Sequence, residues 1–273
     1  MKIGIIGQGF VGNAVYQKFK QFYDILTFDV NEDLCNSSFE EIKSNCKIIF
    51  VCVPTPMNNN RSCDISIVES IIKKLSDVEG LTIVNKSTVV PETTKELSKK
   101  YRKVKLVYNP EFLTERNAIK DYEDQNRIII GGPRPSTNLL KTIFSKVFPN
   151  STIIKTGSTH AEMIKYFTNS LLATKVSFAN EIFQLCEKLE LDYDKVVEYA
   201  IQDERIGNSH LNVPGHDGDL GFGGHCFPKD LSALVKLSEE FGTVNNVLKS
   251  VLKTNNNVRK NKDWEKMKGR AVN

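Results

Sequence analysis

In residues 1–157, short apolar runs alternate with stretches in which apolar residues recur at helical spacing. The runs predict strands and the periodic stretches predict helices. The predicted strands are 2–6, 25–28, 47–53, 81–85, 105–108, 126–130 and 152–155. The predicted helices are 13–22, 65–75, 92–100 and 136–148. This alternation implies a parallel sheet with right-handed crossovers, and the carboxyl ends of such strands are where ligands bind.

From Thr159 the pattern becomes a single helical period that lasts to about Glu190. A helix of some 30 residues is roughly 45 Å long at 1.5 Å per residue, which is longer than a surface helix needs. Its apolar stripe consists of Ile164, Phe167, Leu171, Phe178, Ile182 and Leu185. Such a stripe predicts either a dimer face or packing within one chain, and the pattern leaves both open.

The first predicted strand runs into a glycine-rich turn, Gly7 to Gly12, of the form GxGxxG. Gly7 makes the turn, Gly9 admits a pyrophosphate and Gly12 lets helix and strand pack closely. The second strand ends in Asp29, 22 residues after Gly7, where an acid binds a ribose diol. An acid there repels a 2′-phosphate, so we expect NAD rather than NADP. A turn of this kind without a dinucleotide is the alternative, and the strand and acid together disfavour it.

These features predict an α/β fold in two domains. A Rossmann-type parallel sheet domain that binds NAD occupies 1–157, and an all-helical domain with the long helix at its centre occupies 158–258. A charged tail, 259–273, completes the chain. We expect its basic run, Arg259 to Lys262, to form a solvated helix end.

Composition narrows the class of protein. The chain has 273 residues, 40% hydrophobic and 26% charged, which is typical of an ordered globular protein. A net charge of +4 without a long basic run argues against a nucleic-acid partner. The six cysteines lack CxxC spacing, so neither a metal site nor a redox pair is predicted, and a reducing cytoplasm fits best. No apolar run is long enough for a membrane span, and no export signal is visible.

The predicted strand ends carry polar side chains. Pro54-Thr55-Pro56, Lys86-Ser87-Thr88 and Asn109 to Leu113 follow three successive strands, and Glu115 comes shortly after. The prolines are ordinary turn residues. The hydroxyls and the carboxylates arrive at one edge of the sheet, so they are candidates for ligand binding.

Two further stretches carry candidate chemistry. The loop from Gly221 to Asp230 places Cys226 among glycines, a lysine and an acid at a predicted helix start, which is a setting for a reactive thiol. A glycine-rich turn with a buried cysteine is the alternative. On the long helix, Glu162, Lys165 and Asn169 share one face. That face either stabilises an oxyanion or forms an exposed salt-bridged ridge.

Seven segments in order resemble the motifs of the UDP-glucose/GDP-mannose dehydrogenase family, and the resemblance extends to about Asn257. The segments are Gly7 to Gly12, Val53 to Pro56, Lys86 to Val89, Tyr108 to Leu113, Ala161 to Lys165, Arg205 to Gly207 and Gly221 to Asp230. The resemblance implies a four-electron oxidation of a nucleotide sugar at its C6 alcohol, with two NAD and a cysteine that forms a thiohemiacetal and a thioester. UDP-glucose, giving UDP-glucuronate, is the substrate expected first.

The resemblance also implies residue roles. The catalytic residues are Cys226, Lys165, Asp230, Asn169, Glu111 and Thr88. The cofactor contacts are Gly7, Gly9, Phe10, Val11, Gly12, Asp29, Thr55, Thr88 and Glu115. The substrate contacts are Glu111, Phe112, Leu113, Lys165, Asn169, Arg205, Gly221, Phe222 and Gly224. The arginine that Arg205 matches reaches the substrate of a neighbouring subunit, so a homodimer through the long helix is expected.

The chain departs from the family pattern twice. His225 stands where the family has serine, and we interpret it as tolerated packing. The family also continues into a second α/β domain that closes over the nucleotide, so we expect base and ribose contacts to be missing unless a partner chain supplies them. Two other functions stay open: a β-hydroxyacid-type dehydrogenase, which needs no cysteine, and a non-catalytic NAD-binding remnant.

Overall fold

The computed structural model describes residues 1–273, which divide into two compact units. The first unit comprises residues 1–55 and 64–165, and the second comprises 56–63 and 166–273. The division falls within the long helix. The domain boundary expected at residue 157 stays a prediction.

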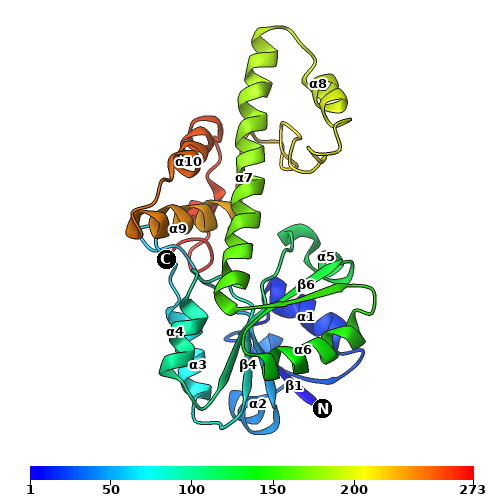
Figure 1. Ribbon diagram of the computed structural model, residues 1–273, viewed down its shortest axis with the longest axis vertical. Coiled ribbons are helices and arrows are strands. Elements are labelled where there is room, and N and C mark those ends of the chain that lie inside the picture. Colours follow the sequence, from blue (N-terminus) through cyan, green and yellow to red (C-terminus); the bar gives the residue numbers. More distant parts are fainter. The chain divides into compact units, whose positions relative to one another are not determined.

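The first unit is built on one seven-stranded sheet in the order β2-β1-β3-β4-β5-β6-β7 (Figure 1). The strands are β1 Lys2–Ile6, β2 Asp24–Phe28, β3 Ile48–Val51, β4 Thr82–Asn85, β5 Lys105–Tyr108, β6 Arg127–Gly131 and β7 Thr152–Thr156. β1 pairs in parallel with both β2 and β3, so the strand order reverses beside β1. Such a switch point is where a dinucleotide binds in this class of sheet. The predicted fold class, a Rossmann-type sheet followed by a helical region, is confirmed.

One strand pair departs from the predicted parallel sheet. β6 pairs with β5 in the antiparallel sense, through Tyr108 and Gly131. Between these strands the chain forms only the short helices η2 Glu115–Asn117 and α5 Ala118–Glu123. A parallel connection requires a crossover element along the sheet, and this segment does not supply one.

Two apolar clusters cover the two faces of the sheet. Successive side chains of a strand point to opposite faces, and accordingly Ile48 and Phe50 enter one cluster while Ile49 and Val51 enter the other. The first cluster includes residues of α1 Phe10–Phe19, α5 and α6 Arg134–Val147. The second includes residues of α2 Phe39–Asn45, α3 Ser66–Leu75 and α4 Thr93–Lys100, and Figure 1 shows both sets of helices about the strands. A short 3-10 helix, η1 Glu32–Leu34, follows β2.

The second unit is helical. It contains most of α7 Ser158–Lys188, followed by α8 Tyr193–Ala200, α9 Phe227–Glu240, α10 Asn246–Val258 and η3 Asp263–Lys266. One core joins α7, α9 and α10, and a second joins α7 to α8 and the following loop. None of the helices combines the length and apolar character that a bilayer span requires.

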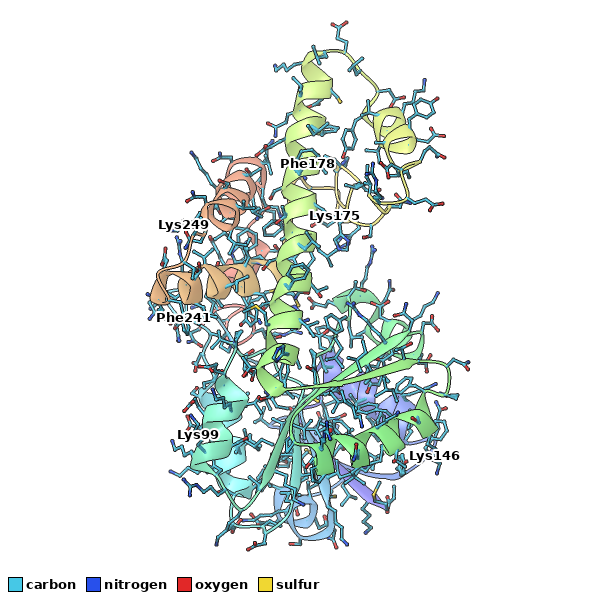
Figure 2. All side chains as sticks on the ribbon, in the orientation of Figure 1. Lys99, Lys146, Lys175, Phe178, Phe241 and Lys249 are labelled. Atoms are coloured by element: carbon cyan, nitrogen blue, oxygen red, sulfur yellow. The ribbon has the colours of Figure 1, made fainter.

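The apolar stripe of α7 is mostly exposed. The exposed fractions are 64% for Phe167, 50% for Leu171, 60% for Phe178 and 54% for Leu185. Phe178 is labelled on α7 in Figure 2. Ile164 and Ile182 are half-buried at the edges of apolar clusters. Packing within one chain, the alternative left open by the pattern, is therefore wrong for the four exposed residues, Phe167, Leu171, Phe178 and Leu185.

The segment after α10 is packed, and the expectation of a solvated helix end is wrong for Arg259. Its side chain is only 1% exposed, and its guanidinium lies 2.7 Å from Asp217 Oδ2, 3.6 Å from Asp219 Oδ2 and 3.5 Å from Asp263 Oδ1. A buried cation needs such compensation. Trp264 is buried as well. A local count of basic residues could not reveal partners that lie some forty positions earlier.

Candidate active site

The glycine turn after β1 has the shape that a pyrophosphate requires. Gly7 has φ +92°, and a Cβ there would collide with the carbonyl of Cys52. A Cβ on Gly12 would collide with the Gly7 carbonyl. At Gly9 a Cβ would meet nothing within 4 Å. The turn is thus closed toward the sheet and open over Gly9, at the N-cap of α1, where backbone N–H groups attract an anion. α1 begins at Phe10, three residues before the predicted start at Asn13, so Phe10, Val11 and Gly12 form its first turn.

Asp29 lies beside this turn. It follows β2, and its Oδ2 accepts a 2.6 Å hydrogen bond from the backbone N–H of Gln8. Its Oδ1 accepts another from Asn31 at 2.9 Å. These bonds hold the carboxylate next to the glycine turn. The arrangement of turn and acid fits a dinucleotide with a free ribose diol.

A cavity of about 460 Å³ adjoins α1 and α5. Its lining includes Phe10 and Glu115, two predicted cofactor residues that are far apart in sequence. Asn13, Arg116 and Lys120 add polar groups. Thr55 and Thr88 are buried near the ends of β3 and β4 and do not line this cavity. The geometry therefore brings part of the predicted cofactor set together.

The predicted catalytic pair of the first unit is in contact. Lys165 Nζ donates to Glu111 Oε1 at 2.8 Å and to the Glu111 carbonyl at 2.7 Å. Both side chains are less than a tenth exposed. Burial alone would raise the pKa of Glu111, but the charge and hydrogen bond of Lys165 and the backbone N–H of Leu113 bring it below its ordinary value. Glu111 is therefore held as a carboxylate against an ammonium.

Glu162 and Lys165 do not form an exposed ridge on α7, since both are buried. The Glu162 carboxylate accepts hydrogen bonds from the backbone N–H groups of Glu92 and Thr94, each at 2.8 Å, at the start of α4. Its carboxylate thereby satisfies otherwise unpaired donors of that helix. Burial raises the pKa of Glu162 to about 7 despite these donors. Glu162 is a structural residue, whereas Lys165 on the next turn reaches Glu111.

The cysteine loop ends at the start of α9, as predicted. Cys226 is the N-cap residue of α9, and it is half-buried. In the first turn, the fully buried Asp230 accepts hydrogen bonds from Asn169 Nδ2 at 2.7 Å and from Lys229 Nζ at 2.5 Å. Burial would lower the pKa of Lys229, but the charges of Asp230, Cys63 and Cys226 raise it above its ordinary value. A helix N-terminus and a retained ammonium both favour a thiolate.

Polar side chains from outside the glycine loop hold its backbone, and two of them, Asn180 and Asn255, are buried. Asn180 Oδ1 accepts the N–H of Gly221 at 2.9 Å. Asn255 binds both the N–H and the carbonyl of Phe222, at 2.7 and 3.0 Å. Asp263 accepts the N–H of Gly224 at 3.0 Å. The sequence does not predict a role for Asn180, Asn255, Asp263 or Arg259. An asparagine on the apolar side of a helical pattern was the available signal for the first two.

Of the other predicted substrate residues, Phe112 and Leu113 contact the Lys165–Glu111 pair, whereas Arg205 pairs with a different acid. The Phe112 ring has the Arg127 guanidinium 4.6 Å and the Lys165 ammonium 5.5 Å from its centre. The backbone N–H of Leu113 donates a 2.7 Å hydrogen bond to Glu111 Oε2. Arg205 is exposed and its guanidinium pairs with Asp203, two residues earlier. The structure therefore places Arg205 at the surface.

The predicted catalytic residues lie in both units. Thr88, Glu111 and Lys165 belong to the first unit, and Asn169, Cys226 and Asp230 belong to the second. Within each unit, contacts that the sequence could only suggest are formed: Lys165 with Glu111, and Asn169 with Asp230.

Models of one family match both parts of the chain. Residues 30–150 match the NAD binding domain of the UDP-glucose/GDP-mannose dehydrogenase family, and residues 159–257 match its central domain. The NAD-binding match agrees with the cofactor expected from the turn and Asp29, although the turn itself precedes the matched segment.

Individual relatives agree with these matches. UDP-glucose 6-dehydrogenase TuaD of Bacillus subtilis is 36% identical over 76% of this chain and 46% of its own length. UDP-glucose 6-dehydrogenase AglM of Haloferax volcanii is 28% identical over 93% of this chain and 69% of its own. A solved UDP-glucose dehydrogenase from Pyrobaculum islandicum is 27% identical with a TM-score of 0.85, covering 94% of this chain and 68% of that one.

The chain spans about half the length of most of the curated relatives it matches. Both domain models nevertheless match in the family's order, and the solved structure reproduces the fold over nearly the whole chain. The chain belongs to the UDP-glucose/GDP-mannose dehydrogenase family.

Proposed function

We propose that this protein catalyses the NAD-dependent oxidation of the C6 alcohol of a nucleotide sugar, UDP-glucose first among them, to a carboxylate. The observation that carries the proposal is the start of α9. There Cys226 occupies the N-cap position of the helix, and a buried Lys229–Asp230 pair bound to Asn169 lies in its first turn. A simple alcohol-to-ketone dehydrogenase has no use for a cysteine in this setting.

The cofactor would be held by the glycine turn, Asp29 and the residues around Phe10 and Glu115. When bound, NAD supplies the acceptor for the two electrons and proton removed in each oxidation. Asp29 would bind the ribose diol and disfavour a 2′-phosphate, since two negative charges would meet there.

Residues of the first unit are assigned two tasks: to stabilise negative charge on the substrate oxygen, and to position and deprotonate the hydrolytic water. The Lys165 ammonium would stabilise the negative charge that develops on the substrate oxygen as the alcohol proton leaves. Glu111, ionised and bound to Lys165, would orient that ammonium and accept a proton from the hydrolytic water. Thr88 is assigned the positioning of this water.

Residues of the second unit are assigned to covalent chemistry. The Cys226 Sγ would add to the aldehyde carbon from the first oxidation, giving a thiohemiacetal whose oxygen takes up a proton. That carbon would then give up a hydride to the bound NAD, and its hydroxyl would give up a proton through the Asp230 relay, which leaves a thioester. Water then bonds to the carbonyl carbon, the C–S bond breaks and the thiol is regenerated. Asn169 would donate to the substrate oxygen, and Asp230 would relay protons through a water.

The choice of UDP-glucose is supported by the relatives, since those reported above are named UDP-glucose dehydrogenases. It is tested by turnover of UDP-glucose, GDP-mannose and UDP-N-acetylated sugars with NAD or NADP. We expect two NADH and one carboxylate per UDP-glucose, with weaker turnover on NADP. One NADH per substrate and a ketone product would indicate a hydroxyacid-type reaction. NAD binding without turnover on any sugar would indicate a non-catalytic protein.

We also propose a homodimer formed through the exposed face of α7, defined by Phe167, Leu171, Phe178 and Leu185. Four large apolar side chains at helical spacing, each at least half exposed, form a contiguous face that a second copy can cover. A charge introduced into such an interface would be buried without water or an opposite charge, which would destabilise the dimer.

Phe178→Asp should therefore shift the protein from dimer to monomer in sedimentation velocity. Phe241→Asp is the matched control, because Phe241 is 68% exposed at the end of α9, away from this face (Figure 2). A Phe178→Asp protein with an unchanged sedimentation coefficient would rule out this face as the interface.

A further inference from the structure

Lys86 is a buried cation to which the proposed reaction assigns no role. It follows β4 and is 2% exposed. Its Nζ donates to Asn109 Oδ1 at 2.8 Å and to the Asn109 carbonyl at 3.3 Å, and it lies 5.4 Å from the centre of the Tyr122 ring. An ammonium is unfavourable in an interior unless nearby groups compensate it. An apolar side chain would fill this space without the desolvation cost of an ammonium. We therefore expect the charge of Lys86 to have a role.

Asn109 connects Lys86 to the strands on both sides. Its Nδ2 donates to the Ile129 carbonyl in β6 at 2.7 Å. Its backbone N–H donates to the Asn85 carbonyl at 2.9 Å. The Asn109 side chain is thus held at its oxygen by Lys86 and at its nitrogen by β6. Glu111 follows two residues later, so the turn that carries it starts from a fixed point.

The charges that face Lys86 include those of the Lys165–Glu111 pair. Burial lowers the pKa of Lys86 to about 8, Cys52 and Glu111 oppose this shift, and Lys165 adds to it. Tyr122 is the remaining titratable group beside it, with a pKa raised by burial. In the other direction, the Lys86 charge helps to lower the pKa of Glu111. Two ammonium groups and one carboxylate therefore share one buried cluster.

We propose that Lys86 is a positioning residue for this site: through Asn109 it fixes the turn that brings Glu111 to Lys165, and its positive charge adds to that of Lys165 beside the Glu111 carboxylate. Its kinetic consequence rests on the proposed function, whereas its effect on Glu111 does not. Glu111 is assigned to orient Lys165 and to accept a proton, so a loosened Glu111 would slow turnover more than it would weaken substrate binding.

The first test measures Glu111 directly. In protein labelled with ¹³C at the glutamate carboxyl, the Glu111 signal is assigned by its absence in Glu111→Gln and followed through a pH titration. We expect its midpoint to rise in Lys86→Met, because a neighbouring positive charge has been removed. Lys105→Met is the matched control, since Lys105 is an exposed lysine on the adjacent β5. An unchanged Glu111 midpoint in a folded Lys86→Met protein would overturn the electrostatic role.

The second test measures turnover. Lys86→Met should lower kcat by about tenfold or more with a KM change of about twofold or less, because lost proton-transfer efficiency appears in kcat. Burial lowers the pKa of Lys86 to about 8, so kcat of the parent should fall above that pH as Lys86 loses its proton, and this fall should be absent in Lys86→Met. Lys105→Met should behave like the parent. A parental kcat and pH profile in Lys86→Met would overturn the kinetic role.

Folding of the variant is checked by its urea transition. If Lys86→Met does not fold, Lys86→Gln retains a donor for Asn109 without the charge and takes its place in both tests. In the unmodified protein, the ¹³Cε signal of Lys86 should show the protonated form at neutral pH, and a neutral Lys86 at that pH would overturn the electrostatic role. Absence of turnover in the unmodified protein would defeat the proposed function but leave the Glu111 titration decisive.

Discussion

Cys226→Ser should stop the protein from making carboxylate while leaving the first oxidation in place. Cys226 is the N-cap residue of α9 beside Lys229, where a thiolate is favoured, whereas a serine hydroxyl is scarcely ionised at neutral pH. An ester is also slower to form and to cleave than a thioester. We expect carboxylate formation to fall by at least about 10³-fold, because removal of a covalent nucleophile costs an enzyme a factor of this size or more.

The measurement is product analysis with NADH counting, alongside mass spectrometry of the peptide that contains residue 226. An ester adduct on that peptide after incubation with UDP-glucose and NAD would show the arrested intermediate. Cys186→Ser is the control, because Cys186 is buried in the second core between α7 and α8. Carboxylate formation at the parental rate in Cys226→Ala would refute the covalent mechanism and leave the cysteine a packing residue.

Lys165→Met should impair both oxidations rather than the second alone. The ammonium of Lys165 is the only group of the first unit assigned to stabilise oxygen charge, and that charge develops in each oxidation. Loss of one such donor costs about 10² to 10³ in rate. The same change leaves Glu111 buried without its 2.8 Å partner, so the pKa of Glu111 should rise.

Pre-steady-state NADH formation separates the two oxidations, because the first turnover of alcohol to aldehyde can be timed alone. Lys165→Met with Glu111→Gln is the informative double variant. It removes both charges together, so it should recover stability relative to Lys165→Met without recovering rate. A Lys165→Met protein with a parental first oxidation would contradict the assignment of this lysine.

The fold was largely predictable because its local signals agree with one another. The glycine turn, the acid after β2 and the alternation of strands and helices each point to the same sheet, and the switch beside β1 follows from that class of fold. The exception is β6. The run at 126–130 was identified as a strand, but its direction depends on how the chain returns from β5, which periodicity does not report.

The site was predictable as a set of residue types and less so as a set of contacts. Lys165 and Asn169 were expected to share a role because of their spacing, yet the structure gives them different partners, Glu111 and Asp230. Lys86 lay inside a recognised segment without an assigned role. Its proposed role rests on its burial, and burial is a property of the folded chain rather than of the segment.

The apolar stripe on α7 is a second case in which the sequence pattern does not determine exposure. Its period identified a helix with an apolar face, but a period is identical for a face covered by the same chain and for one left open. Only the packing of α8 to α10 distinguishes them, because these helices cover other faces of α7. The exposed fractions of Phe167, Leu171, Phe178 and Leu185 resolve the ambiguity that the pattern left.

The support of the glycine loop has a consequence for protein engineering. The backbone of Gly221, Phe222 and Gly224 is held by Asn180, Asn255 and Asp263, which come from α7, α10 and the segment after α10. The ten residues from Gly221 to Asp230 are therefore not a portable module. Grafted alone onto another scaffold, they would lose the acceptors that define their shape. A transplant would have to carry the three anchors, together with the Arg259 guanidinium that pairs with Asp263 and Asp217.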